Sequence, residues 1–139
     1  MAEIIKVSNL KKQFGDLEVL TDISFSVEEG EVICVIGPSG SGKSTLLRCL
    51  NRLEEFQGGR IEVLGQDVGS VPDINVFREN IGMVFQSFNL FPNYTVMKNV
   101  TLAPVALGKM SKEEARKKAE ELLDMVGLSD KKEIGRAHV

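Results

Sequence analysis

The stretch GPSGSGKST, which runs from Gly37 to Thr45, combines three glycines with a lysine and two hydroxyl residues that follow it. Gly37, Gly42, Lys43 and Ser44 fit the spacing G-x-x-x-x-G-K-[ST] of a phosphate-binding loop. Glycines let such a loop curl so that backbone N–H groups face phosphate oxygens without intervening side chains. The stretch therefore predicts a nucleotide site, and it also predicts the fold, because this kind of loop joins a strand to a helix.

The residue types within the loop predict how the nucleotide is held. Lys43 is expected to neutralise charge on the β- and γ-phosphates, and the Ser44 hydroxyl to ligate Mg²⁺. The helix that follows directs its positive N-terminal end at the same anion. On its own the loop fits a kinase, a GTPase, an ATPase or a transporter motor, although the chain lacks the Asn-Lys-x-Asp motif for guanine. The predicted phosphate-binding residues are Gly37, Pro38, Ser39, Gly40, Ser41, Gly42, Lys43, Ser44 and Thr45.

The segments around the loop predict an α/β fold. Residues 31–36 (EVICVI) and 81–85 (IGMVF) are near-continuous apolar runs, which are typical of strands covered on both faces. Leucines at spacings of three and four predict a helix from Lys43 onwards. Residues 3–14 and 17–27 are β-branched and partly alternating, and they predict two antiparallel strands. The alternation of strand and helix in the core favours parallel strands there.

The second part of the chain predicts a surface loop followed by helices. Residues 87–96 (SFNLFPNYTV) are aromatic and rich in turn residues, which is typical of a recognition loop. Thr95 is expected to begin a helix that ends before Pro104. A longer helix is predicted from the capping box of Ser111 to the stop at Gly127. Its predicted apolar stripe consists of Ala115, Ala119, Leu122, Leu123 and Val126.

The composition excludes several classes of protein. The chain has 139 residues, of which 42% are hydrophobic and 27% charged, as in an ordinary globular protein. Its net charge of −3 gives no electrostatic reason to expect a nucleic acid partner. No apolar run approaches the ~20 residues of a membrane span, so any function at a membrane is expected to be exercised from one side of it, through a partner protein. Cys34 and Cys49 lie in apolar stretches and are predicted to be buried, reduced thiols.

The chain resembles the ATP-binding subunits of ABC transporters, and among them those of polar amino acid importers, over residues 4–132. Three segments carry the resemblance: GPSGSGKSTLLRCLNRLEE, IGMVFQSFNLFPNYTVMKNV and LAPVALGKMSKEEARKKAEELLDMVGL. The family implies an α/β P-loop NTPase fold with a RecA-like core, an N-terminal antiparallel β-subdomain and the start of a helical subdomain. It also implies an incomplete domain, in which residues 1–86 form the ATP-binding core, residues 87–132 the Q-loop and partial helical subdomain, and residues 133–139 an atypical tail.

The resemblance assigns roles to two residues outside the loop. Gln86 matches the Q-loop glutamine, which is implied to sense Mg²⁺ and the attacking water. Its residue type alone favours a polar cap where a strand meets solvent, and only the Q-loop context reverses that interpretation. Phe14 matches the aromatic residue that stacks on adenine, although an aromatic side chain between strands is usually part of a core. The implied cofactors are ATP and Mg²⁺, with Ser44 and Gln86 as the metal-binding residues.

The family also implies partners and a place in the cell. The loop after Gln86 is expected to face integral-membrane permease subunits, and a second ATPase subunit is expected to complete a homodimer. A periplasmic or extracellular amino acid binding protein would take part indirectly. The protein is accordingly expected to be peripheral, on the cytoplasmic side of the cell membrane.

Several family motifs do not occur in the sequence. We find no LSGGQ signature, no apolar strand that ends in Asp-Glu, and no histidine other than His138. Phosphoryl transfer to water depends on an oriented nucleophile and positioned charge. The expectation is therefore an N-terminal fragment that binds ATP without efficient hydrolysis and exposes apolar surface. Two alternatives stay open: the ATP-binding subunit of another ABC transporter (methionine import, or the lipoprotein or cell-division type), and a non-catalytic nucleotide-binding fragment.

Overall fold

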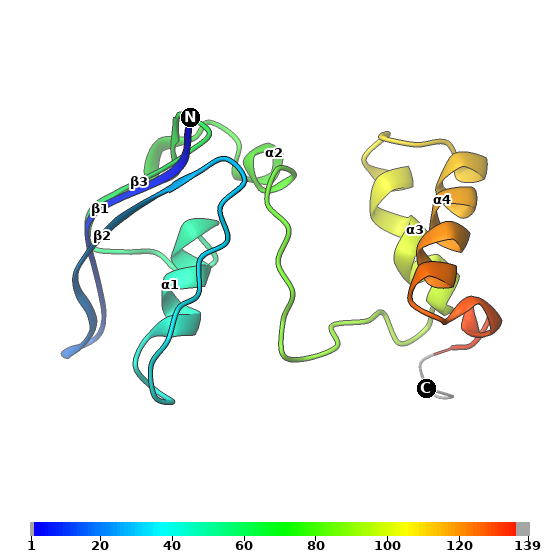
Figure 1. Cartoon of the computed structure of the whole chain (residues 1–139), viewed down its shortest axis with the longest axis horizontal. Coiled ribbons are helices and arrows are strands. Elements are labelled where there is room, and N and C mark those ends of the chain that lie inside the picture. The colour runs from blue at the N-terminus through cyan, green and yellow to red at the C-terminus, as the bar shows by residue number, and fades with distance from the viewer. Residues whose placement is uncertain (1, 136–139) are drawn as a thin grey trace. The chain divides into compact units, whose positions relative to one another are not determined.

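The structure is a computed structural model that describes residues 2–135, and its chain divides into two compact units (Figure 1). The first unit is Met1–Met83 and the second is Val84–Val139. His138 lies outside the described residues. Within residues 2–135 no helix combines the length and the apolar character needed to cross a membrane.

The first unit is built on a four-stranded antiparallel sheet with the strand order β2-β1-β3-β4. The predicted hairpin of the first two strands is confirmed, and Gly15 sits at its turn with a φ of +60°. A positive φ of this kind is accessible to glycine without steric cost. The strands are β1 (Glu3–Phe14), β2 (Leu17–Glu28), β3 (Gly58–Val63) and β4 (Gln66–Asp67).

Strand β1 carries a β-bulge at Asn9. β1 has one residue more than β2 between Val7 and Leu10, and one residue more than β3 between Ser8 and Lys11. Asn9 takes a φ of +49°, and its backbone N–H donates to the Ser24 hydroxyl at 2.8 Å. An extra residue shifts the in–out alternation of a strand by one position. The buried residues of β1 therefore change from Val7 before the bulge to Leu10 and Lys12 after it.

One helix and two short helical turns complete the first unit. The predicted helix is confirmed as α1 (Lys43–Leu50), which buries Leu46 and Cys49. The sequence then forms η1 (Val68–Ser70) and α2 (Ile74–Arg78); the Asp73 carboxylate caps α2 by accepting the Asn75 N–H at 3.0 Å. Burial of these apolar side chains is the main stabilising term of the unit. The core consists of Val7, Leu10, Leu20, Leu46, Cys49, Ile61, Val63, Val68 and Phe77.

The two apolar runs that predicted core strands, 31–36 and 81–85, form no regular secondary structure, so that prediction is wrong for this structure. Among residues 2–135 no strand pairs with either run, and a ladder needs a partner for its backbone groups. The predicted parallel pairing is therefore not formed. The expected exposure of apolar side chains is confirmed, with Val32, Ile36 and Val84 each at least 90% exposed.

The two cysteines have different surroundings, which corrects the prediction that both are buried. Cys34 is exposed because the run 31–36 that contains it is uncovered. Cys49 is buried on α1, and both thiols are free, as predicted. Burial raises the pKa of the Cys49 thiol to about 11, with Lys12 lowering it and Glu54 raising it to smaller extents.

The raised pKa of Cys49 predicts a loss of stability at high pH. Above pH 9 the thiol ionises in the unfolded chain while it stays protonated in the folded unit, so the free energy of unfolding falls between about pH 9 and pH 11. Urea denaturation at pH 8 and pH 10.5 measures the loss. Cys49→Ala should show a smaller loss than the wild type, whereas Cys34→Ala should match the wild type. Equal losses in all three proteins would contradict the prediction.

The second unit contains a pair of packed helices, α3 (Val96–Ala106) and α4 (Lys112–Met125), followed by η2 (Ser129–Lys131). The predicted helix start at Thr95 and the predicted cap at Ser111 are both confirmed. The Thr95 hydroxyl accepts the Lys98 N–H at 3.1 Å, and the Ser111 hydroxyl accepts the Glu114 N–H at 3.2 Å. Gly127 follows the end of α4 with a φ of +76°, as a left-handed residue after a helix does.

Two details of these helices correct the predictions. Helix α3 continues past Pro104 and ends two residues later, at Ala106. The proline lacks one backbone N–H, so this last turn loses only one helical hydrogen bond. The apolar stripe of α4 is only partly buried. Leu122 and Val126 are 41% and 66% exposed, since α4 packs along a narrower face than its apolar residues cover. The buried residues of the stripe are Ala115, Ala119 and Leu123.

Candidate nucleotide-binding site

The glycine-rich loop is anchored to strand β2 by a close approach at Gly42. This residue has a φ of +97° and precedes the first residue of α1. A Cβ atom at Gly42 would lie 3.0 Å from Val19 Cγ1 and 3.1 Å from Leu20 Cδ2. A side chain here would therefore meet both the backbone strain and the strand. Packing against β2 therefore gives a reason for a glycine at position 42 that is additional to the binding of a phosphate.

Lys43 lies across the loop. Its ammonium group donates to the backbone carbonyl oxygen of Gly37 and, at 3.3 Å, to that of Pro38. The Ser41 N–H donates to the same Pro38 oxygen at 3.1 Å, which tightens the loop. The lysine charge is thus held beside the backbone that the sequence predicts to surround phosphates.

Helix α1 begins directly at the loop without a side-chain cap. The first N–H groups of a helix have no acceptor within the helix. Together with the Lys43 ammonium they concentrate positive charge at the start of α1, which suits a phosphate oxygen. The structure thus brings the predicted loop residues together in an arrangement that is able to bind an anion.

The predicted magnesium ligand Ser44 is exposed on the first turn of α1. Its hydroxyl oxygen is the hard donor type that Mg²⁺ prefers. Among residues 2–135 no three His, Cys, Asp or Glu side chains are grouped so that they could hold a metal. The donor set therefore fits a magnesium ion that receives most of its ligands from phosphate oxygens and water, with Ser44 as one protein ligand.

Phe14 ends β1 on the same side of the hairpin as the loop. The register pairs Lys12 with Leu20, which is the residue that approaches Gly42. Phe14 lies two positions further along β1, or about 7 Å by the rise of a strand. Its side chain is 44% exposed, and the Lys12 ammonium lies 4.4 Å from the centre of its ring. The position leaves ring surface open to a ligand.

Gln86 belongs to the second unit, where it is exposed and lies outside regular secondary structure. The loop that follows it is held by Asn99, a residue of α3 that sequence reasoning missed. The Asn99 side-chain oxygen Oδ1 accepts the Phe91 N–H at 2.8 Å, and the side-chain Nδ2 donates to the Thr95 backbone carbonyl at 2.9 Å. The sequence signal for such a residue is a short amide side chain one turn into a helix, just after a polar loop.

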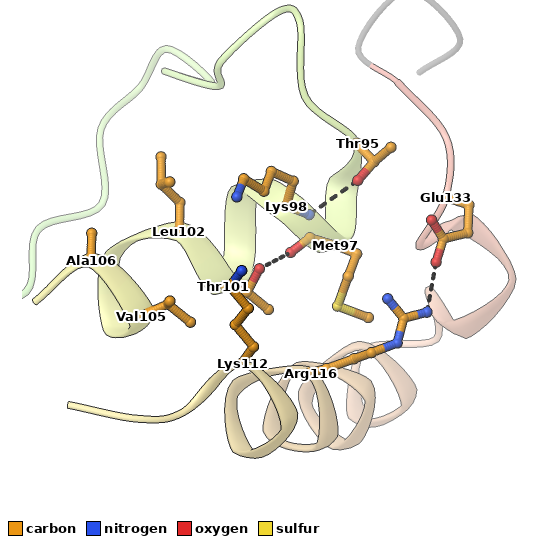
Figure 2. A pocket seen from close by; sticks show the side chains of 10 residues that line it. All are labelled: Thr95, Met97, Lys98, Thr101, Leu102, Val105, Ala106, Lys112, Arg116 and Glu133. Carbon is orange, nitrogen blue, oxygen red and sulfur yellow. Dashed lines mark hydrogen bonds and ion pairs between the residues drawn. The ribbon is translucent and has the colours of Figure 1, made fainter. Parts of the chain in front are cut away.

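A separate cavity of about 440 Å³ lies between α3 and α4 within the second unit (Figure 2). Arg116 and Glu133 form an ion pair at its wall at 2.8 Å, and the hydrogen bond that Arg116 donates to the Glu133 carboxylate raises the pKa of Arg116. The Thr101 hydroxyl donates to the Met97 carbonyl at 2.9 Å. None of the residues predicted to form the site lines this cavity.

Comparison with known proteins identifies the family. Residues 20–138 match the family model described as ABC transporter. The chain is 54% identical over 131 residues to the arginine transport ATP-binding protein ArtM of Bacillus subtilis, with 93% of this chain and 54% of that protein covered. It is 49% identical to the glutamine transport ATP-binding protein GlnQ of Bacillus subtilis, with 92% and 53% covered. It is 48% identical to the glutamate transport ATP-binding protein GluA of Corynebacterium glutamicum, with 91% and 53% covered.

A solved structure agrees with this assignment. The dimeric ATP-binding cassette MJ0796, in a post-hydrolysis state bound to ADP and Pi, superposes with a TM-score of 0.83 at 32% identity. The match covers 97% of this chain and 62% of that one, and it confirms the predicted fold class. The chain spans about half the length of the curated relatives it matches. Loop, fold and sequence agree, and the chain belongs to the ABC transporter family.

Proposed function

We propose that this chain belongs to an ATP-binding subunit that energises ABC-type import of a polar amino acid. The observation that carries the proposal is the phosphate loop, with the Lys43 ammonium across its carbonyl oxygens at the start of an uncapped helix. The substrate class is supported by the relatives, which are named for arginine, glutamine and glutamate transport. Because these relatives are about twice as long, the transport activity is proposed for the whole protein.

The proposed ligand is Mg-ATP. Lys43 and the backbone of residues 37–45 would bind the phosphates, and the Ser44 hydroxyl would contribute one ligand to the metal. Phe14 would stack on the adenine through its exposed ring surface. Gln86 is proposed to be a second metal-binding residue that also contacts the attacking water. Magnesium supplies charge neutralisation for phosphoryl transfer when it is bound.

The proposed partners are permease subunits in the membrane, a second ATPase subunit and, indirectly, an amino acid binding protein. The loop after Gln86 is proposed as the permease-binding surface because it exposes aromatic side chains: Phe88 and Phe91 are 84% and 53% exposed. Aromatic residues are enriched in the cores of protein interfaces. The subunit would act as a peripheral protein on the cytoplasmic side of the membrane.

We further propose that the 139-residue chain binds ATP without efficient turnover. Hydrolysis needs a group that orients water, and the sequence contains neither the Asp-Glu strand end nor the signature motif of the family. Phosphate release by the purified chain in Mg-ATP is expected to equal that of Lys43→Ala within error. A lysine-dependent rate above this background would refute the proposal.

Uptake by cells tests the transport function. The Lys43→Ala substitution is introduced into the gene of the whole protein, and uptake of labelled arginine, glutamine and glutamate is measured. The proposal expects loss of uptake of at least one of these amino acids. Lys6→Ala, which changes an exposed lysine on β1, serves as the matched control and should leave uptake intact. Unchanged uptake of polar amino acids in the Lys43→Ala cells would contradict the assignment.

A further inference from the structure

Lys12 is a buried lysine with two partners. The residue is only 6% exposed, and its ammonium nitrogen lies 3.7 Å from Glu54 Oε2. The same nitrogen lies 4.4 Å from the centre of the Phe14 ring. Lysine is almost never this deeply buried unless its charge is paired. The carboxylate of Glu54 explains why the charge is tolerated, whereas the contact with the ring calls for a separate reason.

The fold places these groups from two directions. The bulge at Asn9 turns Lys12 to the buried face of β1, and Phe14 has the same parity along the strand. Glu54 comes from the segment after α1, where its backbone N–H donates to the Arg48 carbonyl at 3.2 Å. The helix that begins at the phosphate loop therefore also supports the segment that holds the Lys12 ammonium.

We propose that Lys12 is a positioning residue for the nucleotide base, acting through Phe14; this inference rests on the proposed nucleotide site. The ammonium occupies one face of the ring and limits its rotation, which leaves the other face for an adenine. An aromatic face attracts a cation electrostatically, and a partly desolvated contact of this kind is strong. The cation also withdraws density from the ring, which favours stacking on an electron-rich purine. Glu54 orients the ammonium.

The role predicts an effect that depends on the base. A ligand without a base, such as inorganic triphosphate, contacts the loop and Lys43 but has nothing to stack on Phe14. Loss of the Lys12 ammonium should therefore weaken ATP binding and spare triphosphate binding. A purely structural role would weaken both ligands together, because both need the same folded loop.

The experiment measures the dissociation constants of ATP and inorganic triphosphate, each with Mg²⁺, by calorimetry on the 139-residue chain. Lys12→Met keeps the length of the side chain without its charge. It is expected to weaken ATP binding roughly three- to tenfold, as befits a cation–π contact, and to leave triphosphate binding unchanged. Lys12→Arg should restore most of the ATP affinity. Lys11→Met, on the exposed neighbour of the same strand, should change neither ligand.

Further variants keep the test decisive. Glu54→Gln leaves Lys12 in place but removes the carboxylate that orients its ammonium, so it should also weaken ATP binding. This variant tests the proposal independently where Lys12→Met lowers the melting temperature. In a Phe14→Leu background, Lys12→Met should have no further effect on ATP. The positioning role would be overturned if Lys12→Met weakened ATP and triphosphate binding equally. It would also be overturned if Lys12→Met weakened ATP binding further in the Phe14→Leu background. A wild-type chain that binds neither ligand would instead refute the proposed nucleotide site.

Discussion

Lys43→Ala is expected to weaken Mg-ATP binding by the 139-residue chain at least ~100-fold, about 3 kcal/mol. The substitution removes a charge that would contact two phosphates, and it also removes the bonds to the Gly37 and Pro38 carbonyls that hold the ammonium over the loop. Titration of the chain with ATP in a calorimeter or with a fluorescent analogue measures the loss.

The comparison variant is Lys6→Ala, which removes the same charge from an exposed position on β1. It should bind Mg-ATP as the wild type does, because a change in net charge alone has little effect at physiological salt. A Lys43→Ala chain that kept its affinity within a factor of a few would show that the loop does not bind the phosphates. The melting temperatures of both variants are expected to stay near that of the wild type.

Gly59→Ala is expected to destabilise the first unit by about 4 kcal/mol or more, enough to unfold much of it. Gly59 has a φ of +87°, and a Cβ atom there would lie 2.6 Å from the carbonyl oxygen of Ser8. The clash involves the backbone at the β1 bulge, which has little freedom to move. Urea denaturation followed by circular dichroism measures the change in the free energy of unfolding.

Gly30→Ala separates the clash from the backbone strain. Gly30 has nearly the same φ, +85°, yet nothing lies within 4 Å of its added Cβ. Its substitution should therefore cost only the left-handed strain of about 1 kcal/mol. Similar losses for the two variants would mean that the close approach of Gly59 to β1 is not maintained in solution.

Local signals in the sequence predicted most of what proved correct. The helix start at Thr95, the cap at Ser111, the stop at Gly127 and the start of α1 at Lys43 each depend on residues within one turn of chain. A cap or a tight turn is decided by hydrogen bonds between near neighbours in sequence. Such features are therefore readable without knowledge of the rest of the fold.

The features that could not be predicted depend on distant parts of the chain. Residues 31–36 have the composition of a buried strand, but a strand forms only where another lies beside it. The burial of Lys12 was hidden as well, because strict alternation from Val7 points Lys11 inward instead. Only the pairing register reveals the extra residue at Asn9. The hydrophobic pattern of a segment indicates which secondary structure it favours, but the segments that pair with it decide whether that structure forms and which side chains are buried.

The bulge at Asn9 has a consequence for how the length of β1 can vary. Losing one residue between Val7 and Leu10 would turn Lys12 and Phe14 to the opposite face, while the strand before the bulge would keep its core contacts. Losing or gaining two residues would preserve the direction of both side chains. Insertions and deletions of an even number of residues in this strand should therefore be tolerated better than those of an odd number, whatever their size. Leu10 also lies after the bulge and belongs to the core, so an odd change in length would displace a core side chain together with Lys12 and Phe14.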